Sequence, residues 1–232
     1  SHNSSIVRPN THPLPPAHRN LLPAQCPLVK PALTTPPPTT TPPPTALVDK
    51  LLINVTSFFR DPDMWTTIAS EVIPLIFLNA SSFDLRFWVA GCSTGEEAFT
   101  LGMLILEHLG SITHPERWTV RIFATDIDLQ ALEYARAGKY PMVAGSEIPS
   151  HLRARYFVEH TPGTLEVVPR LRHLMVFVPH NLLTNPPFIS MNLIACRNVS
   201  PCVHAVHAVH AHAHARVLLC LCLYARACYV CE

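Results

Sequence analysis

The fold is decided by the stretch Leu85-Arg86-Phe87-Trp88-Val89-Ala90-Gly91-Cys92-Ser93-Thr94-Gly95-Glu96-Glu97. Its first six residues are large and mostly apolar, which predicts a buried β-strand. Residues 91–95 are small and predict a loop, in which glycine lets the backbone approach a ligand closely. We expect a helix from Glu96 to Gly110, because apolar residues recur at helical spacing at Leu101, Leu104, Ile105 and Leu109. The stretch therefore predicts a strand, a small-residue loop and a helix.

A second strand and a second helix follow the first pair. Residues 120–124, Val-Arg-Ile-Phe-Ala, predict the strand, and Asp126-Ile127-Asp128 comes directly after it. Asp128 is suited to cap the next helix, and Gly138 to end it. Such alternation with short connections predicts an α/β fold with a parallel sheet and helices on both faces. The two loops then lie at the edge where such sheets bind ligands.

The flanking segments extend this pattern in both directions. A helical pattern begins near Ala46 and breaks at Asn54, and a new helix starts at Asp61-Pro62, with an apolar face formed by Trp65, Ile68, Val72 and Ile76. Between Tyr140 and Val178 we expect a small β insertion, with a short helix near Ser150 and two brief strands at Thr164–Val168 and Leu174–Val178. The last expected strand, Met191–Cys196, leads to Arg197 and Asn198.

Acidic residues at the two loops indicate the kind of ligand. No Gly-Lys-Ser/Thr follows the first loop, and Glu96 and Glu97 would repel a pyrophosphate, so a neutral or cationic nucleoside fits better. The same two glutamates are equally consistent with favourable charges in a first helical turn. Asp126, at the end of the second strand, is placed to accept hydrogen bonds from ribose hydroxyls. Its alternative role as a helix cap suits Asp128 better.

Five motifs in order resemble the CheR family, whose members use S-adenosylmethionine to methylate glutamate side chains of chemotaxis receptors. The motifs are Asn54-Val55-Thr56-Ser57-Phe58-Phe59-Arg60, Ala90-Gly91-Cys92-Ser93-Thr94-Gly95-Glu96-Glu97, Thr125-Asp126-Ile127-Asp128, Asn181-Leu182 and Cys196-Arg197-Asn198-Val199. The resemblance covers about two thirds of the chain. It implies a Rossmann-like S-adenosylmethionine-dependent methyltransferase fold, the cofactor S-adenosylmethionine and protein-glutamate O-methyltransferase activity.

The resemblance also implies roles for individual residues. Asn54, Thr56 and Arg60 would line the methionine and methyl end of the cofactor, with Glu97 beside the methionine portion. Asp126 would hold the ribose, while Asn181, Leu182, Arg197 and Asn198 would flank the adenine and the entry to the methyl-transfer site. Arg60 would be the catalytic residue that orients the incoming carboxylate; the alternative is a surface arginine after two core phenylalanines. No general base is needed, because a glutamate with a pKa of about 4.3 is ionised at pH 7.

Composition divides the chain into three parts. Residues 1–45 are rich in Pro and Thr and predict a disordered tether, residues 46–199 form the CheR-like domain, and residues 200–232 are a low-complexity His/Ala/Cys tail. After Val199 the family continues with an Ile-Tyr-Phe strand ending, a helix and further strands, whereas this chain departs from that pattern. We therefore expect an incomplete sheet that lacks the family's tyrosine near the methyl group. The histidines and cysteines of the tail do not have zinc-finger spacing, so no metal site is expected.

Charge and hydropathy exclude other classes of partner. The formal net charge is +1, and no Lys/Arg cluster predicts nucleic-acid binding. No apolar run approaches the roughly 20 residues of a membrane span. We expect a cytoplasmic monomer whose partner is the cytoplasmic domain of a chemotaxis receptor. The alternatives are a noncatalytic S-adenosylmethionine-binding or scaffolding module, or an inactive gene-model fragment.

Overall fold

The structure, a computed structural model, describes residues 56–197, 217–221 and 228–231. All of these residues belong to one compact unit, Pro43–Glu232. The helical pattern that begins near Ala46, and the candidate site residues Asn54 and Asn198, lie outside the described residues, as does the tether 1–45. The boundaries of the three predicted parts stay predictions.

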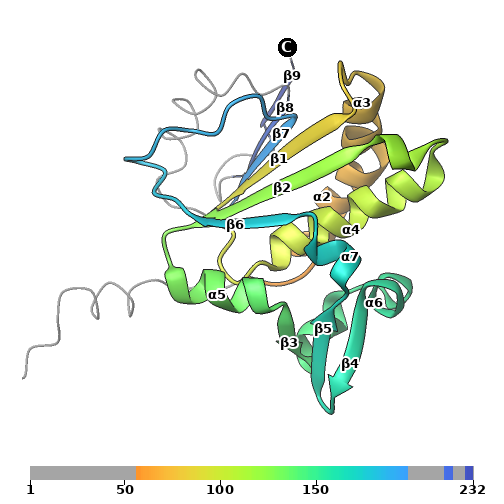
Figure 1. The fold of residues 1–232 in the computed structure, drawn as a ribbon, viewed down its shortest axis with the longest axis vertical. Coiled ribbons are helices and arrows are strands. Elements are labelled where there is room, and N and C mark those ends of the chain that lie inside the picture. Colours follow the sequence, from red (N-terminus) through yellow and green to blue (C-terminus); the bar gives the residue numbers. More distant parts are fainter. Residues whose placement is uncertain (1–55, 198–216, 222–227, 232) are drawn as a thin grey trace, which may run out of the picture. The chain divides into compact units, whose positions relative to one another are not determined.

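The main sheet has six strands in the order β6-β2-β1-β7-β8-β9 (Figure 1). These strands are β1 (Asp84–Ala90), β2 (Thr119–Asp126), β6 (Met175–Pro179), β7 (Leu193–Arg197), β8 (Val217–Leu221) and β9 (Cys228–Cys231). Neighbours from β6 to β8 run parallel, and β9 returns antiparallel to β8. Because β1 and β2 lie inside the sheet and β1 precedes β2 through a helix, the predicted parallel α/β fold is confirmed.

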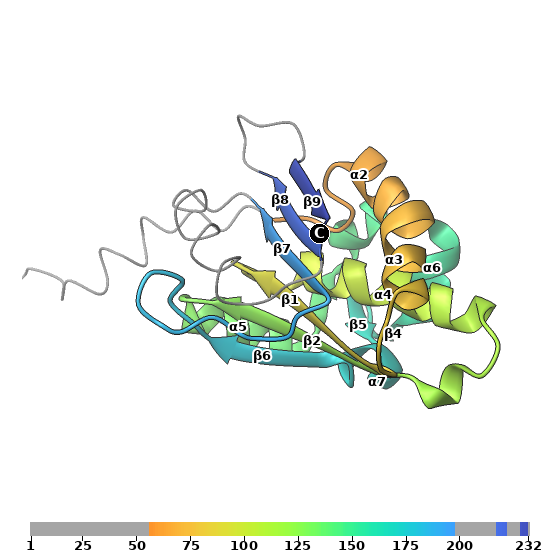
Figure 2. The ribbon, with the colours of Figure 1, turned by 90° about the horizontal axis from the view of Figure 1, so that it is seen from above.

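Several helices in the described part of the chain pack on one face of this sheet. They are α2 (Pro62–Thr67), a π-helical turn (Ile68–Val72), α3 (Ile73–Leu78), α4 (Glu96–Ser111) and α5 (Leu129–Ala137). Buried residues of α3, α4 and α5 share one hydrophobic cluster with Leu85, Phe87 and Val89 of β1. Figure 2 shows α3 and α4 side by side on this face.

The opposite face differs from the expectation of helices on both faces. Trp88 points to that face, where its ring packs against His180 and Phe188 from the segment after β6. In the described residues this segment takes the place of a helix there. The sequence pattern did not reveal this, because the contact of Trp88 with residues about a hundred positions later leaves no local signal.

The two local helix signals at Asp61-Pro62 and Asp128 are confirmed. The helix that starts at Pro62 buries Trp65, Ile68, Val72 and Ile76, as their spacing predicted. Pro74 cannot donate a backbone hydrogen bond to the preceding turn, which accounts for the π-helical turn just before it. Gly138 ends α5 in the left-handed region with φ of 62°.

A second, antiparallel sheet has the order β3-β5-β4. Its strands are β3 (Lys139–Pro141), β4 (Phe157–Thr161) and β5 (Thr164–Val167), and the 3₁₀ helix Met142–Glu147, α6 (Ser150–Tyr156) and α7 (Pro169–Arg172) accompany them. Another short 3₁₀ helix, Pro115–Arg117, precedes β2. The predicted β insertion is therefore present. One of its expected strands, Leu174–Val178, was placed wrongly: it is β6, and it pairs with β2 in the main sheet.

The tail also adds to the main sheet, contrary to the expected incomplete edge. The backbone of β8 pairs with β7 between Ile194↔Leu218 and Arg197↔Leu221, and β9 pairs with β8. Residues 217–221 are Val-Leu-Leu-Cys-Leu, an apolar run that favours a strand. The repetitive composition before this run concealed that signal.

Candidate cofactor-binding site

The loop after β1 is held closely against the end of β2. The backbone N–H groups of Gly91 and Cys92 both donate to the carbonyl of Thr125, at 2.7 and 2.9 Å. Gly91, Ser93 and Gly95 have positive φ values of 71°, 48° and 94°. The small residues therefore permit a tight turn that carries the backbone from the carboxyl end of β1 to the start of α4.

Gly95 and Tyr140 fix the far end of this loop. A Cβ atom on Gly95 would lie 2.8 Å from Ala135 Cβ and 3.2 Å from Tyr140 Oη, so no larger residue fits without movement. The Tyr140 hydroxyl donates to the carbonyl of Thr94 at 2.7 Å. Burial raises the pKa of Tyr140 well above its usual value, which keeps the hydroxyl protonated as a donor.

Asp126 joins the loop to the end of β2. Its Oδ2 accepts a hydrogen bond from Ser93 N at 2.7 Å, and its Oδ1 accepts one from Asp128 N at 3.0 Å. Asp128, by contrast, caps α5 by accepting from Gln130 N and Ala131 N at 2.9 and 3.1 Å. The prediction that Asp128, rather than Asp126, caps this helix is therefore confirmed. Each Asp126 oxygen has a further lone pair for a ligand hydroxyl.

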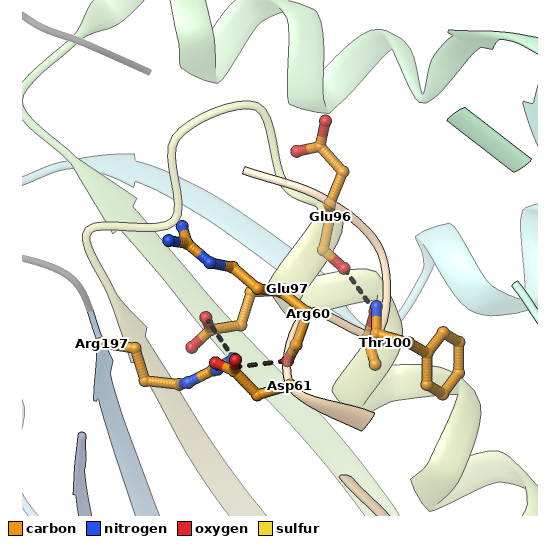
Figure 3. Close-up of polar contacts among 7 residues, drawn as sticks. Arg60, Asp61, Glu96, Glu97, Thr100 and Arg197 are labelled. Carbon is orange, nitrogen blue, oxygen red and sulfur yellow. Dashed lines mark hydrogen bonds and ion pairs between the residues drawn. The ribbon is translucent and has the colours of Figure 1, made fainter. Parts of the chain in front are cut away.

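The two glutamates that begin α4 point in different directions (Figure 3). Glu96 accepts a hydrogen bond from Thr94 Oγ1 at 2.7 Å, and burial raises its pKa. Glu97 points toward Arg197, and its Oε2 accepts from Arg197 Nη1 at 3.2 Å. Burial raises the pKa of Glu97 to about 7, against the opposing effect of Arg197. Glu97, rather than Glu96, is therefore the glutamate that contacts Arg197.

Arg197 is the buried centre of a polar cluster that it forms with Glu97, Arg60 and Asp61, and its side chain is 1% exposed. Besides Glu97, it donates through Nη2 to the carbonyl of Arg60 at 3.2 Å and to the carboxylate of Asp61. Its guanidinium also lies 5.5 Å from the centre of the Trp65 ring. Arg197, predicted to flank the adenine, thus ties the end of β7 to the start of α4 and to the segment before α2.

Arg60 belongs to a tightly turned segment between the two hydrophobic cores. Phe58 is buried, Phe59 N donates to Thr100 Oγ1 at 3.3 Å, and the Arg60 side chain is partly exposed. Arg60 lies near enough to Glu97 to oppose the rise in the pKa of that residue. Thr56, also partly exposed, lies four residues before Arg60 at the beginning of the described range.

Asn181 and Leu182 follow the end of β6, beside Asp126. The link is His180 N, which donates to the carbonyl of Asp126 at 2.9 Å. Asn181 Oδ1 accepts from Leu183 N at 2.9 Å, so its side chain shapes the turn. Both residues therefore lie at the same sheet edge as the loop, and their contact with the nucleoside stays a prediction.

Three contributors were not predicted from the sequence: Asp61, Tyr140 and His180. Asp61 was predicted only as part of a helix start, and Tyr140 carries no local signal for its bond to Thr94. His180 precedes Asn181 directly, and its ring packs 5.4 Å from that of Trp88. Its Nε2 lies 3.1 Å from the carbonyl of Pro186. Only its position beside Asn181 could have drawn attention to it.

The electrostatic character of the loop suits a cationic ligand. Burial, and then the negative charges of Asp126, Glu97 and Glu96, raise the pKa of the Cys92 thiol far above its ordinary value. When ionised, these carboxylates stabilise a positively charged ligand beside the loop and disfavour a phosphate there. In the described residues no group of His, Cys, Asp or Glu could hold a metal ion.

Buried polar atoms without partners show where a polar ligand fits. Within the described part these include Ser93 Oγ, Glu97 Oε1 and His180 Nδ1, all buried and without a hydrogen-bond partner. Ser93 belongs to the loop after β1, Glu97 to the first turn of α4, and His180 directly follows β6. Unpaired buried polar groups are costly, so a ligand with both hydrogen-bonding and cationic parts would relieve them. S-adenosylmethionine, with a nucleoside and a cationic methionine end, has both.

The parallel sheet, the small-residue loop and the acidic residues at the ends of β1 and β2 define a nucleoside-binding α/β domain. Residues 54–202 match the family described as CheR methyltransferase, SAM binding domain. This match spans more than half of the chain, so the protein belongs to the CheR methyltransferase family. S-adenosylmethionine is the cofactor of this domain.

Relatives of known sequence agree with this assignment. A chemotaxis protein methyltransferase of Escherichia coli is 33% identical over 159 residues, which cover 66% of this chain and 52% of the relative. One from Borreliella burgdorferi is 32% identical over 158 residues, 66% of this chain and 55% of the relative. An uncharacterized 104.1 kDa protein of Rhodobacter capsulatus is 42% identical over 151 residues, but these cover only 15% of it. The chain thus spans about half the length of the chemotaxis methyltransferases that it matches.

Among solved structures, DszA carbon methyltransferase covers 68% of this chain and 35% of its own, with 11% identity and a TM-score of 0.42. A likeness at this level adds nothing to the family assignment. None of the helices in the described ranges has the length and hydropathy that a bilayer span requires.

Proposed function

We propose that the protein is a protein-glutamate O-methyltransferase, which transfers a methyl group from S-adenosylmethionine to glutamate side chains of a chemotaxis receptor. One observation carries this proposal: the Arg60 segment is anchored through Arg197 to Glu97, at the sheet edge that belongs to the cofactor-binding domain. An arginine there is suited to receive a substrate carboxylate next to the cofactor.

The chemistry asks little of the side chains. When bound, S-adenosylmethionine supplies an activated methyl group on a positively charged sulfur. The glutamate substrate is ionised at neutral pH, so Arg60 need only orient its carboxylate, without removing a proton. Good alignment of the two reactants contributes roughly 7 to 11 kcal/mol to such reactions. The rigid contacts around Arg197 support this alignment, because they fix the backbone from which Arg60 projects.

The remaining residues are proposed to hold the cofactor. Asp126 accepts hydrogen bonds from the ribose, and Asn181 and Leu182 line the adenine. Asn54, Thr56 and Glu97 surround the methionine end. The near-complete burial of Arg197 supports a role exerted through Glu97 and the Arg60 backbone, and Asn198 lies next along the chain.

The proposed partner is the glutamate-bearing cytoplasmic domain of a chemotaxis receptor, so we place the protein in the cytoplasm, as a monomer. A second candidate function is cofactor binding without catalysis, as a sensing or scaffolding module. The change of sequence after Val199, where the family's tyrosine has no counterpart, favours this second candidate.

Two experiments separate these functions. Isothermal titration with S-adenosylmethionine tests cofactor binding, which an inactive chain without a stable fold would not show. Transfer of a labelled methyl group to a receptor cytoplasmic fragment then tests catalysis. Arg60→Ala should abolish most transfer while leaving a measurable dissociation constant for the cofactor, and Arg117→Ala, remote from the site, serves as the control. Binding with no transfer by the parent protein would support the noncatalytic module.

A further inference from the structure

Asp61 has an unusual position for an aspartate that precedes a helix. It is the N-cap residue of α2, yet its side chain makes no capping hydrogen bond. Aspartate at this position normally uses its carboxylate to cap the first backbone N–H groups. The Asp61 carboxylate instead reaches the buried guanidinium of Arg197. This carboxylate therefore serves another part of the molecule.

The backbone of Asp61 points to the same conclusion. Its φ of 61° and ψ of 69° lie in the left-handed region, which L residues rarely adopt. Glycine would occupy this conformation more easily. This conformation directs the carboxylate toward Arg197. The contact with Arg197, rather than an easy turn, therefore accounts for an aspartate at this position.

Arg197 passes the effect of Asp61 to the cofactor site. Its Nη2 contacts both Asp61 and the carbonyl of Arg60, while its Nη1 contacts Glu97 (Figure 3). A guanidinium is planar, so partners on both nitrogens fix its orientation. Without Asp61, Arg197 would lose the partner that opposes Glu97, and the backbone of Arg60 would lose part of its anchor.

We infer that Asp61 is a positioning residue of the cofactor site, which acts through Arg197 to fix the Glu97 carboxylate and the Arg60 backbone for binding of S-adenosylmethionine. The inference rests on S-adenosylmethionine as the cofactor. It depends on the proposed function only where Asp61 is expected to affect methyl transfer. Asp61 itself is exposed and touches neither reactant in this role.

Two substitutions and one control test the inference by isothermal titration with S-adenosylmethionine. Asp61→Asn removes the charge at constant shape, and Asp61→Gly removes the carboxylate while easing the left-handed backbone. We expect both to weaken binding about tenfold, a modest effect because the carboxylate is exposed. Asp63→Asn, in the exposed first turn of α2, should stay within about twofold of the parent.

A second measurement needs neither cofactor nor activity. The negative charge of Asp61 raises the pKa of Glu97, so its removal should lower that pKa in a carbon-detected NMR titration of the Glu97 carboxyl group. Asp63→Asn should leave it in place. If Asp61 served only the local backbone turn, Asp61→Gly, which eases that turn, would fold and bind the cofactor like the parent.

Parent-like cofactor binding by either Asp61 variant would overturn the inference, as would a parent protein that binds no cofactor. If Asp61→Gly unfolds by circular dichroism, Asp61→Asn decides. Tight binding by a parent that transfers no methyl group would defeat the proposed function alone, because the inference is judged on the dissociation constants.

Discussion

The guanidinium of Arg197 lies 3.2 Å from the carboxylate of Glu97, although 100 residues separate them in the chain. The pair joins the last residue of β7 to the first turn of α4, at the edge of the sheet. Arg197 is almost fully buried, and the side chain of Glu97 is 15% exposed. This pairing makes the site sensitive to changes of charge in ways that can be measured.

Replacement of Arg197 by methionine should strongly destabilise the fold. The change leaves Glu97 buried without its cation, and breaking such a pair costs about 3 kcal/mol of unfolding free energy. Urea unfolding followed by circular dichroism measures this loss. Arg121→Met is the matched control, because Arg121 pairs with Asp84 at the surface, where both side chains are about half exposed. That control should lose no more than about 1 kcal/mol. Equal losses in the two variants would contradict the burial argument.

Glu97 should make stability depend on pH in a particular direction. Its pKa is raised to about 7, so the folded state favours the neutral carboxyl group. The stabilisation is complete below the ordinary glutamate pKa and is lost as pH rises through about 7. Relative to Glu97→Gln, the parent should lose on the order of 3 kcal/mol between pH 4 and 8. Glu133→Gln, on the exposed surface of α5, is the control in urea unfolding at each pH.

The Glu97 carboxyl group should also couple cofactor binding to proton release. The positive charge of S-adenosylmethionine favours ionised Glu97, so binding near pH 6.5 should release a proton. Titration calorimetry in buffers of different ionisation enthalpy measures the number released, which should fall toward zero in Glu97→Gln. A binding enthalpy that does not vary with the buffer would rule out this role.

Much of the central fold was predictable because its signals are local. The strand, loop and helix from Leu85 onward, the cap at Asp128 and the stop at Gly138 each depend on residues within one or two turns of the chain. The place of Leu174–Val178 in the main sheet was not predictable, because a short apolar strand carries no mark of its partner. The strand at 217–221 was not predicted, because the repeats directly before it give the tail a low-complexity composition.

The residues of the site likewise include some that the sequence predicts and some that it does not. Glu97 and Asp126 were located by their positions after predicted strands. The position of Asp126 also predicted its role as a ribose acceptor, whereas the resemblance supplied the role of Glu97. The contact of Asp61 with Arg197 joins residues 136 positions apart, and no local pattern reveals it. Arg197 was expected near the adenine, but a sequence cannot show how deeply a side chain is buried among three elements.

Replacement of Gly95 by alanine should disturb the loop more than its backbone conformation alone explains. The new Cβ would lie 2.8 Å from Ala135 Cβ, in addition to the cost of a φ of 94°. Gly163→Ala is the control, since Gly163 has a φ of 80° with no atom within 4 Å of the added Cβ. We expect a loss of about 1 kcal/mol for the control and about 3 kcal/mol for Gly95→Ala, from urea unfolding. Similar losses would show that the loop yields to the added methyl group.

Asp126 and Asp128 lie two residues apart and should behave differently when each is replaced by alanine. Asp128→Ala removes the cap of α5 and should cost about 1 kcal/mol of stability while cofactor affinity stays near that of the parent. Asp126→Ala removes the proposed ribose acceptor and the bond to Ser93 N, so cofactor binding should weaken at least about tenfold. Urea unfolding and isothermal titration with S-adenosylmethionine on the same two proteins provide both quantities. If Asp126→Ala bound the cofactor as tightly as the parent, the ribose site would have to lie elsewhere.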